Sequence, residues 1–226
     1  MAERILFPDA DAVVDALTFA GRTARLGDGA VRLQARGGTL AMSSAPLAPK
    51  TLMDPTPTIL ALRALPVDPE LECDLVVEAS ALLRDPQDDR AVLLPETALS
   101  AMWAGISAPR TGWTAATEIE ASELAARAQW GIAAVAEAMP ADAGEDIVHT
   151  VRAAVWGESD AAIADLPRGA AFAAFALGFI VGQESARVLT SGAWTRLSLT
   201  RGHIIVRRPV RAGLTQVRTT GRPPAA

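Results

Sequence analysis

The chain has 226 residues, half of them hydrophobic, and a formal net charge of −5. This length is enough to bury a core without disulfides or metal ions. Cys73 is the only cysteine, which excludes an intrachain disulfide and favours a reducing compartment, so we expect a cytoplasmic protein. Residues 1–8 lack a signal-peptide pattern, and the longest apolar stretch, residues 169–182, is shorter than the ~20 residues that span a bilayer. We therefore expect no membrane partner.

The charges are distributed unevenly along the chain. All 26 acidic residues lie at or before Glu184, whereas residues 185–226 carry eight arginines and no acid. Such asymmetry indicates either an anionic partner or a basic strand pair that packs on acidic helices of the same domain, and we favour the second explanation. Lys50 is the only lysine, and together with the abundant alanine this indicates a bacterial-type, high-GC coding sequence rather than an adaptation to function.

The first part of the chain predicts one helix followed by strands. Apolar residues recur at helical spacing over residues 10–24, and Asp9 is placed to cap that helix. Residues 30–47 alternate on either side of a turn at 36–38, which predicts a hairpin. Prolines make the following stretch a loop, and we expect strands over 58–65 and 73–81.

The middle of the chain predicts helices. Pro95 could open a helix, and residues 106–114 form a loop. Thr117 and Glu120 have the spacing of a capping box, which predicts a helix that runs from there to Met139. Asp142 and Glu145 repeat this spacing before a second helix that ends near Gly157.

The last part predicts one more helix and a second hairpin. Residues 168–181 are apolar on nearly all sides, which indicates a central helix that ends near Gly182. Residues 195–199 and 203–208 predict a hairpin with its turn at 201–202, and residues 213–226 predict a mobile tail. A short match between Val31-Arg32-Leu33 and Thr195-Arg196-Leu197 hints at an internal repeat but is too short to establish one.

This order of elements predicts a segregated α+β fold in one domain spanning residues 1–226. We expect an antiparallel sheet that is formed by the N-terminal hairpin and strands together with the C-terminal hairpin. Three to four helices should pack against it. The terminal strands would then pair with the early sheet.

The familiar catalytic and metal-binding motifs are absent from the sequence. Two histidines and one cysteine without paired spacing argue against a zinc site, and no nucleotide-binding or acyl-transfer motif follows a predicted strand, so we expect no metal and no cofactor. His149 has Glu145 and Arg152 one helical turn away, which would suit a general base, although a solvated helix face with weak ion pairs is the plainer interpretation. We expect structural roles for His203 and Cys73.

Two other groups of residues are candidate binding sites. Trp103 and Trp113 flank a loop that carries Arg110, and an arginine beside an exposed indole can hold a carboxylate or phosphate. The alternative is that both indoles anchor the loop to the core. The second group is the arginines of the C-terminal hairpin, which could contact an anionic partner: Arg196, Arg201, Arg207 and Arg208.

The sequence therefore favours a non-catalytic protein that binds another protein or a small anionic ligand, with self-association through an apolar helix or a sheet edge. One alternative is an enzyme without a cofactor that uses His149 and Arg110 in a cleft. A second alternative is weak nucleic-acid binding by the C-terminal hairpin, which the acidic chain disfavours.

Overall fold

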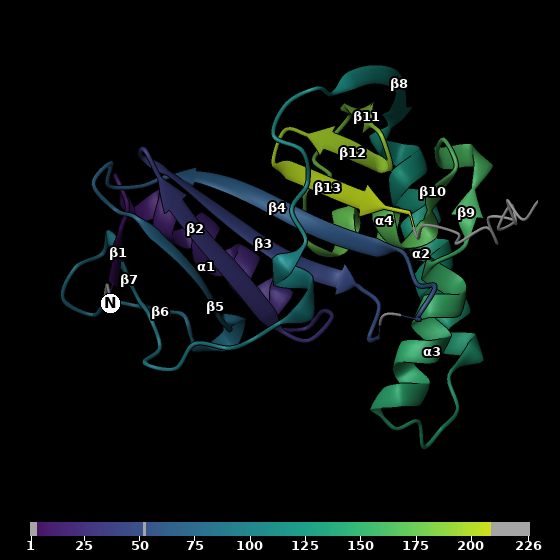
Figure 1. Cartoon of the computed structure of the whole chain (residues 1–226), viewed down its shortest axis with the longest axis horizontal. Helices are drawn as coiled ribbons and strands as arrows, with labels where there is room; N and C mark the ends of the chain where they lie inside the picture. The colour runs from purple at the N-terminus through teal and green to yellow at the C-terminus, as the bar shows by residue number, and fades with distance from the viewer. Residues whose placement is uncertain (1–3, 52, 209–226) are drawn as a thin grey trace, which may run out of the picture.

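The structure is a computed structural model that describes residues 4–51 and 53–208. The predicted tail, residues 213–226, lies outside the described residues. Two halves follow one another along the chain (Figure 1). The elements of the first half are β1 Arg4–Leu6, α1 Ala10–Thr23, β2 Ala30–Arg36, β3 Thr39–Leu47, β4 Thr58–Pro66, β5 Cys73–Glu78, the 3-10 turn η1 Ala79–Ala81, β6 Leu83–Arg84 and β7 Ala91–Leu93.

The second half begins after a linker, residues 94–113, which contains one 3-10 turn, η2 Met102–Gly105. Its elements are β8 Thr114–Glu120, α2 Ala121–Ala138, α3 Glu145–Trp156, β9 Ser159–Asp160, η3 Ala161–Ile163, β10 Leu166–Pro167, α4 Arg168–Ala176, β11 Ser185–Ser191, β12 Trp194–Leu199 and β13 Gly202–Arg207.

One antiparallel sheet of eight strands runs through both halves in the order β5-β2-β3-β4-β13-β12-β11-β8. The halves meet where β13 pairs with β4, from His203 opposite Leu62 to Arg207 opposite Thr58. Two smaller sheets, β1-β7-β6 and β10-β9, complete the strands (Figure 1). This confirms the predicted α+β class, the two predicted hairpins and the pairing of the terminal strands with the early sheet.

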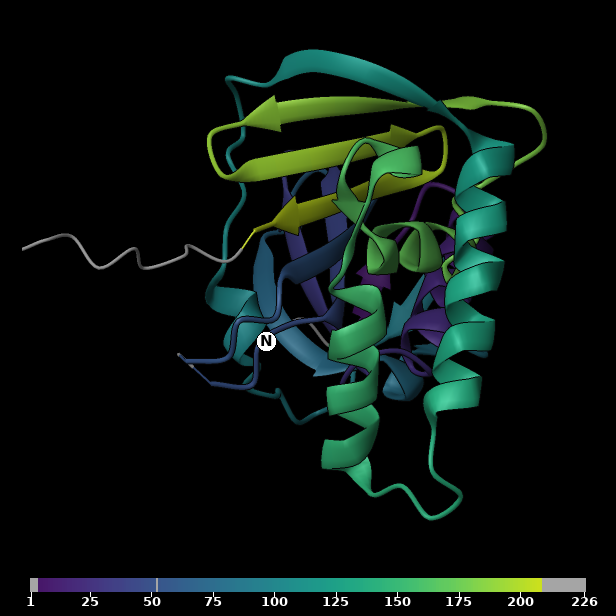
Figure 2. The ribbon, with the colours of Figure 1, turned by 90° about the vertical axis from the view of Figure 1, so that its right-hand side faces the viewer.

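The helices cover one face of this sheet. α1 packs on β2, β3 and β4, α4 packs on β3, β4 and β13, and α2 packs on α4. Because side chains alternate along a strand, Ile204 and Val206 of β13 reach the core under the helices, whereas Ile205 points to the opposite face. We call the helix-free side the outer face. In Figure 2 the linker lies on the opposite side of the β11–β13 strands from α2.

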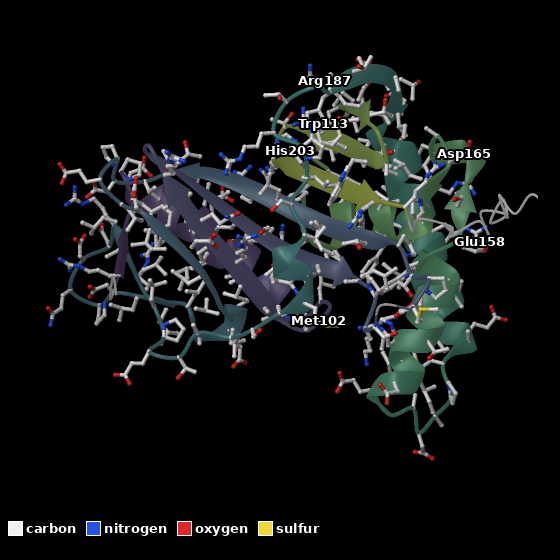
Figure 3. The ribbon with its side chains drawn as sticks, viewed as in Figure 1. Met102, Trp113, Glu158, Asp165, Arg187 and His203 are labelled. Atoms are coloured by element: carbon white, nitrogen blue, oxygen red, sulfur yellow. The ribbon has the colours of Figure 1, made fainter. Side chains whose placement is uncertain are left out.

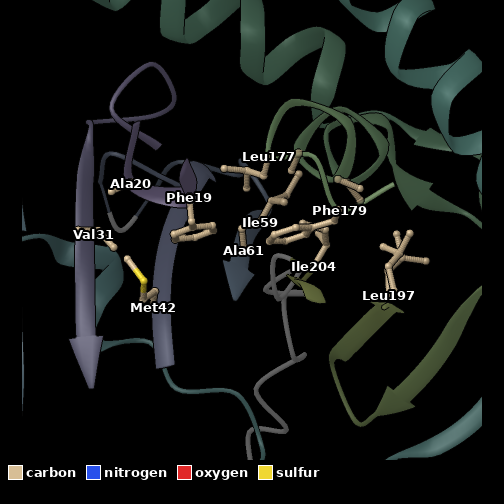
Figure 4. Packing of buried hydrophobic residues seen from close by; sticks show 14 of the residues in the cluster. Phe19, Ala20, Val31, Met42, Ile59, Ala61, Leu177, Phe179, Leu197 and Ile204 are labelled. Carbon is tan, nitrogen blue, oxygen red and sulfur yellow. The ribbon is translucent and has the colours of Figure 1, made fainter. Parts of the chain in front are cut away.

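The core continues across the junction of the two halves (Figure 4). The rings of Phe19 in α1 and Phe179 after α4 stack with centroids 6.0 Å apart. Arg22 of α1 donates from Nη1 to the carbonyl oxygen of Leu177 at 2.7 Å, which satisfies a free carbonyl at the end of α4. Gly178 has a positive φ of 69°, and a side chain there would overlap the Arg22 guanidinium. The predicted helix 168–181 therefore ends at Ala176, before that glycine.

One strong local prediction was wrong. Thr117 and Glu120 do not start a helix, because residues 114–120 form the edge strand β8, which pairs with β11. α2 starts at Ala121, and its preceding residue Glu120 makes no side-chain cap. The capping-box spacing is a local signal, and pairing with a strand about seventy residues later outweighs it. β11 itself was not predicted, and Pro95 does not open a helix, since residues 94–101 contain none.

α2 and α3 form a helical hairpin that extends beyond the end of the sheet (Figures 1 and 2). The predicted second helix is present as α3, but it starts at Glu145 after Gly144, which gives no side-chain cap, so Asp142 does not cap it as predicted. Trp156 is its one buried residue, and this ring stacks on Phe172 of α4 with centroids 3.9 Å apart. Among the described residues, no helix has the length and apolar character needed to cross a bilayer.

We expect Gly202→Ala to lower the free energy of unfolding by about 1–3 kcal/mol, because the new Cβ would lie 2.6 Å from the ring of Phe179 and overpack the junction. Urea unfolding measures this change. Gly21→Ala is the matched control, since its Cβ meets nothing within 4 Å and alanine favours a helix, so it should be neutral or stabilising. A Gly202→Ala protein as stable as the wild type would contradict this account of the junction.

Candidate functional site: an arginine and tryptophan patch on the outer face

The linker between the halves crosses the outer face of the sheet (Figure 1). It starts at the β5 edge, where the Leu99 amide donates to the Val76 carbonyl at 2.7 Å, and reaches the β8 edge at Thr114. The Trp103 indole is buried on the outer face, and its Nε1 donates to Asp28 at 2.8 Å. Trp103 therefore anchors the linker, and its predicted role in ligand binding gains no support from this placement. The indole packs among Ala30, Ala45, Leu60 and Ile205.

Beyond Trp103, three cross-strand rows of the second half make up the rest of this face. Strand pairing places the residues of β13, β12 and β11 side by side on one surface, where neighbouring side chains interact. The rows are His203, Ser198 and Arg187, then Ile205, Arg196 and Leu189, then Arg207, Trp194 and Ser191. We call the outer-face cluster of Trp113, Arg187, Trp194, Arg196, His203 and Arg207 the Trp–Arg patch. Figure 3 labels Trp113, Arg187 and His203 around these strands.

Two arginines of the patch lie over indole rings. The guanidinium carbon of Arg196 is 4.8 Å from the ring centroid of Trp113, and that of Arg207 is 5.6 Å from the ring centroid of Trp194. Trp113 in turn donates from Nε1 to the Pro109 carbonyl at 2.9 Å, which fixes the end of the linker. These cation–π contacts hold the guanidinium groups close to the indoles.

The positive charges of the patch are not neutralised within the described part of the chain. Neither Arg187 nor Arg196 makes an ion pair there, and the buried Nε of Arg196 has no hydrogen-bond acceptor. Burial and the nearby Arg187 both lower the pKa of Arg196. An unsatisfied buried donor beside a like charge is costly, and a bound anion would remove both penalties.

His203 lies in the same patch, with Nδ1 3.1 Å from the Ser198 hydroxyl. Burial lowers the pKa of His203, and the charges of Arg196, Arg187 and Arg63 lower it further. The ring therefore resists protonation. Arg187 was missed because β11 was not predicted as a strand; the buried Ala186 and Val188 on either side of Arg187 are the alternation that could have indicated it.

The other predicted arginines are spread out. Arg110 is exposed on the linker loop and is not among the residues that line the His149 pocket. Arg201 lies at the β12–β13 turn, where its carbonyl accepts from Arg63. Arg208 donates to the Asp165 carbonyl at 2.9 Å. Only Arg196 and Arg207 of the predicted anion-contacting group lie on the outer face.

His149 lies in a separate pocket of about 430 Å³ between α3 and the β3–β4 loop. Its Nε2 is 3.4 Å from a carboxylate oxygen of Asp54, rather than near Glu145 or Arg152 as predicted from helical spacing. Asp54 also accepts from the amides of Lys50 and Thr56 and from the Thr56 hydroxyl, and these bonds hold its pKa at about 2, although burial opposes them. The carboxylate has little capacity left for a ligand, so His149 and Asp54 anchor α3 to the loop.

The two sheet edges differ in accessibility. At one edge, the linker covers part of β5. At the other edge, β8 is mostly exposed, and Ile119 is its one buried side chain. A β-bulge separates Ala115 from Thr117 in the pairing with β11, and such irregularities hinder strand addition. Self-association at a sheet edge stays a prediction.

Comparisons with known proteins add two findings. Residues 1–105 match the model of a domain of unknown function, DUF8010, and residues 108–211 match that of another domain of unknown function, DUF8185. The boundary between the two matches falls in the linker. No curated protein matches the sequence.

The solved structures with a similar shape are bacterial sliding clamps. The DNA polymerase sliding clamp of Caulobacter crescentus is 12% identical, with 99% of this chain and 70% of the clamp covered and a TM-score of 0.49. The sliding clamp of Bartonella birtlesii is 13% identical, with 93% of this chain and 65% of the clamp covered and a TM-score of 0.49. DNA polymerase III subunit beta of Pseudomonas aeruginosa is 11% identical, with 97% of this chain and 68% of that protein covered and a TM-score of 0.45.

These findings correct the function expected from the sequence. The sequence led us to expect a small-ligand-binding or unspecified interaction domain, with an enzyme or a weakly nucleic-acid-binding hairpin as alternatives. The similar structures named above are DNA polymerase sliding clamps instead. The enzyme alternative required His149 and Arg110 to line one cleft. The pocket that contains His149 is not lined by Arg110, so this version of the alternative gains no support.

We expect wild-type stability to fall as the pH is lowered from about 7 to 5. The unfolded chain protonates His203 near the ordinary histidine pKa of about 6.5, whereas the folded chain resists protonation, so the unfolded state binds more protons in this interval. His203→Gln can keep a hydrogen bond to Ser198 without titrating, and it should flatten this part of the curve. Thermal unfolding of both proteins at pH 5, 6 and 7 measures how stability changes with pH. The same change with pH in the wild type and in His203→Gln would contradict this role of His203.

Proposed function

We propose that the chain is a protein-docking domain that holds an acidic segment of a partner protein on the Trp–Arg patch. One observation carries the proposal: Arg187 and Arg196 lie together on a partly apolar surface, and neither side chain makes an ion pair with a described residue, although Glu118 stands opposite Arg187 in the strand pairing. Arginine and tryptophan are the residues that most often dominate binding at protein interfaces. A carboxylate can take up the free hydrogen-bond donors of a guanidinium group in a bidentate fashion.

The chemistry of the patch favours a polypeptide over a nucleic acid. Nucleic-acid binding commonly uses many phosphate contacts and open aromatic rings on which bases stack. Here Arg196 and Arg207 cover the two indoles, and β8 places Glu118 opposite Arg187 in the strand pairing. That carboxylate would repel a phosphate backbone that continued past the patch toward the sheet edge. It would repel an acidic segment in the same way, so the covered indoles are the feature that favours a polypeptide over a nucleic acid.

The net charge of the whole chain does not oppose this proposal. Acidic residues lie elsewhere, for example at the tip of the α2–α3 hairpin, where Lys50 pairs with Asp146 at 3.0 Å. Exposed charges separated by more than about 10 Å are largely screened at physiological salt. The local charge of the patch therefore determines what docks there.

Fluorescence anisotropy with a labelled twelve-residue glutamate peptide at about 0.1 M salt tests this proposal. We expect binding by the wild-type chain and binding at least tenfold weaker for Arg187→Gln/Arg196→Gln, because about 1.4 kcal/mol or more is lost with the charged hydrogen bonds. Arg36→Gln/Arg25→Gln is the charge-matched control, since both arginines are exposed in the first half and their loss should leave binding unchanged.

A labelled twenty-nucleotide oligothymidine is the comparison probe in the same assay. We expect it to bind more weakly than the peptide. Tighter binding of the oligonucleotide, or equal loss of peptide binding in Arg36→Gln/Arg25→Gln, would overturn the assignment of the patch to an acidic protein partner.

A further inference from the structure

β8 lies at one end of the eight-stranded sheet, and part of its backbone points away from the sheet (Figure 1). The amide of Ala121 donates to the carbonyl of Glu184 at 2.9 Å, and the direction of hydrogen bonding alternates from one residue to the next in an antiparallel strand. Ile119 therefore turns its amide toward β11, whereas the amides of Glu118 and Glu120 point away from it. Neither of these two amides has an acceptor among the described residues.

The β-bulge in β8 does not interrupt this stretch. The bulge separates Ala115 from Thr117, whereas residues 117–120 pair with residues 185–188 in regular register. The irregularity hinders strand addition at the start of β8 but not beyond it. An accessible edge of four residues is left.

A groove of about 500 Å³ lies beside these four residues. Its lining comes from β8, the start of α2 and the η3 loop: Thr117, Glu118, Ile119, Glu120, Ser122, Glu123, Ala161, Ala162 and Ala164. Ile119 is the residue of this stretch whose side chain points to the helix side of the sheet, where it joins the core. A residue placed opposite Ile119 on an added strand would enter the groove beside the small alanine side chains.

The η3 loop is held in place by its own contacts. Asp160 accepts from the amide of Ala162 through its carboxylate and from the amide of Asp165 through its carbonyl, each at 3.0 Å. Arg208 donates to the carbonyl of Asp165 at 2.9 Å. Ala164 and Asp165 both have positive φ values, 57° and 56°, which residues with a Cβ keep only where the surrounding structure holds them. This wall of the groove is therefore formed before a partner binds.

The outer-face side of the edge carries two carboxylates. Because side chains alternate along a strand, Glu118 and Glu120 lie on the face opposite Ile119. Glu118 makes no ion pair with a described residue, although Arg187 stands opposite it, and Glu120 accepts from the Ser185 hydroxyl at 2.8 Å. Opposite charges at directly paired positions of neighbouring strands contribute roughly 0.2–1 kcal/mol per pair. The two carboxylates thus favour basic residues at every second position of an added strand.

The same carboxylates disfavour a second copy of this chain at the edge. An antiparallel pairing of two β8 strands around Ile119 would set Glu118 of one copy opposite Glu120 of the other. Like charges at directly opposed positions destabilise a strand pair.

We infer that β8 accepts an antiparallel strand from a basic partner protein, with a lysine or arginine opposite each of Glu118 and Glu120. An apolar residue between the two basic residues enters the groove opposite Ile119. Main-chain hydrogen bonds to the outward amides supply affinity, and the alternating side chains supply specificity. This edge lies next to the Trp–Arg patch and selects the opposite charge, so the inference goes beyond the proposed function.

Three peptides that differ only in N-methylation test the strand pairing. The parent is fluorescein-labelled Ser-Thr-Lys-Val-Lys-Thr-Ser-amide, and fluorescence anisotropy at about 0.1 M salt measures its binding. In an antiparallel pair the two lysine amides would point at β8 and the valine amide away from it. We expect N-methylation of both lysines to weaken binding about tenfold, because two main-chain hydrogen bonds are lost. N-methylation of the valine should leave binding unchanged.

Two variants of the protein test the charge selection. Glu118→Gln/Glu120→Gln should weaken binding of the parent peptide about fivefold, since both cross-strand charge pairs are lost. Glu70→Gln/Glu72→Gln is the matched control, because these glutamates are exposed before β5 in the first half, and it should bind as the wild type does.

Amide chemical shifts locate the bound parent peptide on the wild-type protein. We expect changes along residues 117–120 and 161–164. Equal weakening by the two forms of N-methylation, or shift changes confined to residues away from this edge, would refute strand addition. Equal binding by the two double variants would refute the charge selection, and a parent peptide that does not bind would overturn the whole inference.

Discussion

The pairing of β4 with β13 is the interaction on which the rest of the structure depends. These strands are about 140 residues apart in sequence, and their ladder turns two four-stranded parts into one sheet of eight strands. It brings Phe179 over Gly202 and places Phe19 of α1 beside it, so the two halves share a core. Closing so long a loop costs conformational entropy, which the buried contacts along this junction must offset.

The same pairing determines what the outer face can do. Because the sheet is continuous, the linker can start at the β5 edge, cross the strands and continue into β8, with Trp103 buried along its path. It covers the first half more fully than the second. The arginines of β11, β12 and β13 are left beside it, two of them over indoles and none neutralised by an ion pair within the described residues.

The contrast between Arg32 and Arg187 shows how context changes the chemistry of one residue type. Both are arginines of the outer face on strands that lie next to an edge of the sheet. Arg32 is neutralised by Asp74 and covered by Ala104, and it therefore stabilises the fold. Arg187 is exposed and makes no ion pair with a described residue, although Glu118 stands opposite it in the strand pairing. The basic C-terminal segment thus does not dock on acidic helices through this arginine, the explanation that its composition favoured.

The sequence by itself determined the elements whose signals are local. The Asp9 cap, the 36–38 turn and the 201–202 turn each act through residues a few positions apart, so α1 and both hairpins could be predicted, and with them the α+β class. Trp113, Arg196 and Arg207 could likewise be named as candidates from residue type. Only the tertiary structure decided that residues 114–120 form a strand, that Arg187 joins the patch and that His149 meets Asp54. Each of these depends on partners distant in sequence, and a local pattern carries no information about which distant strand or loop will supply the hydrogen bonds.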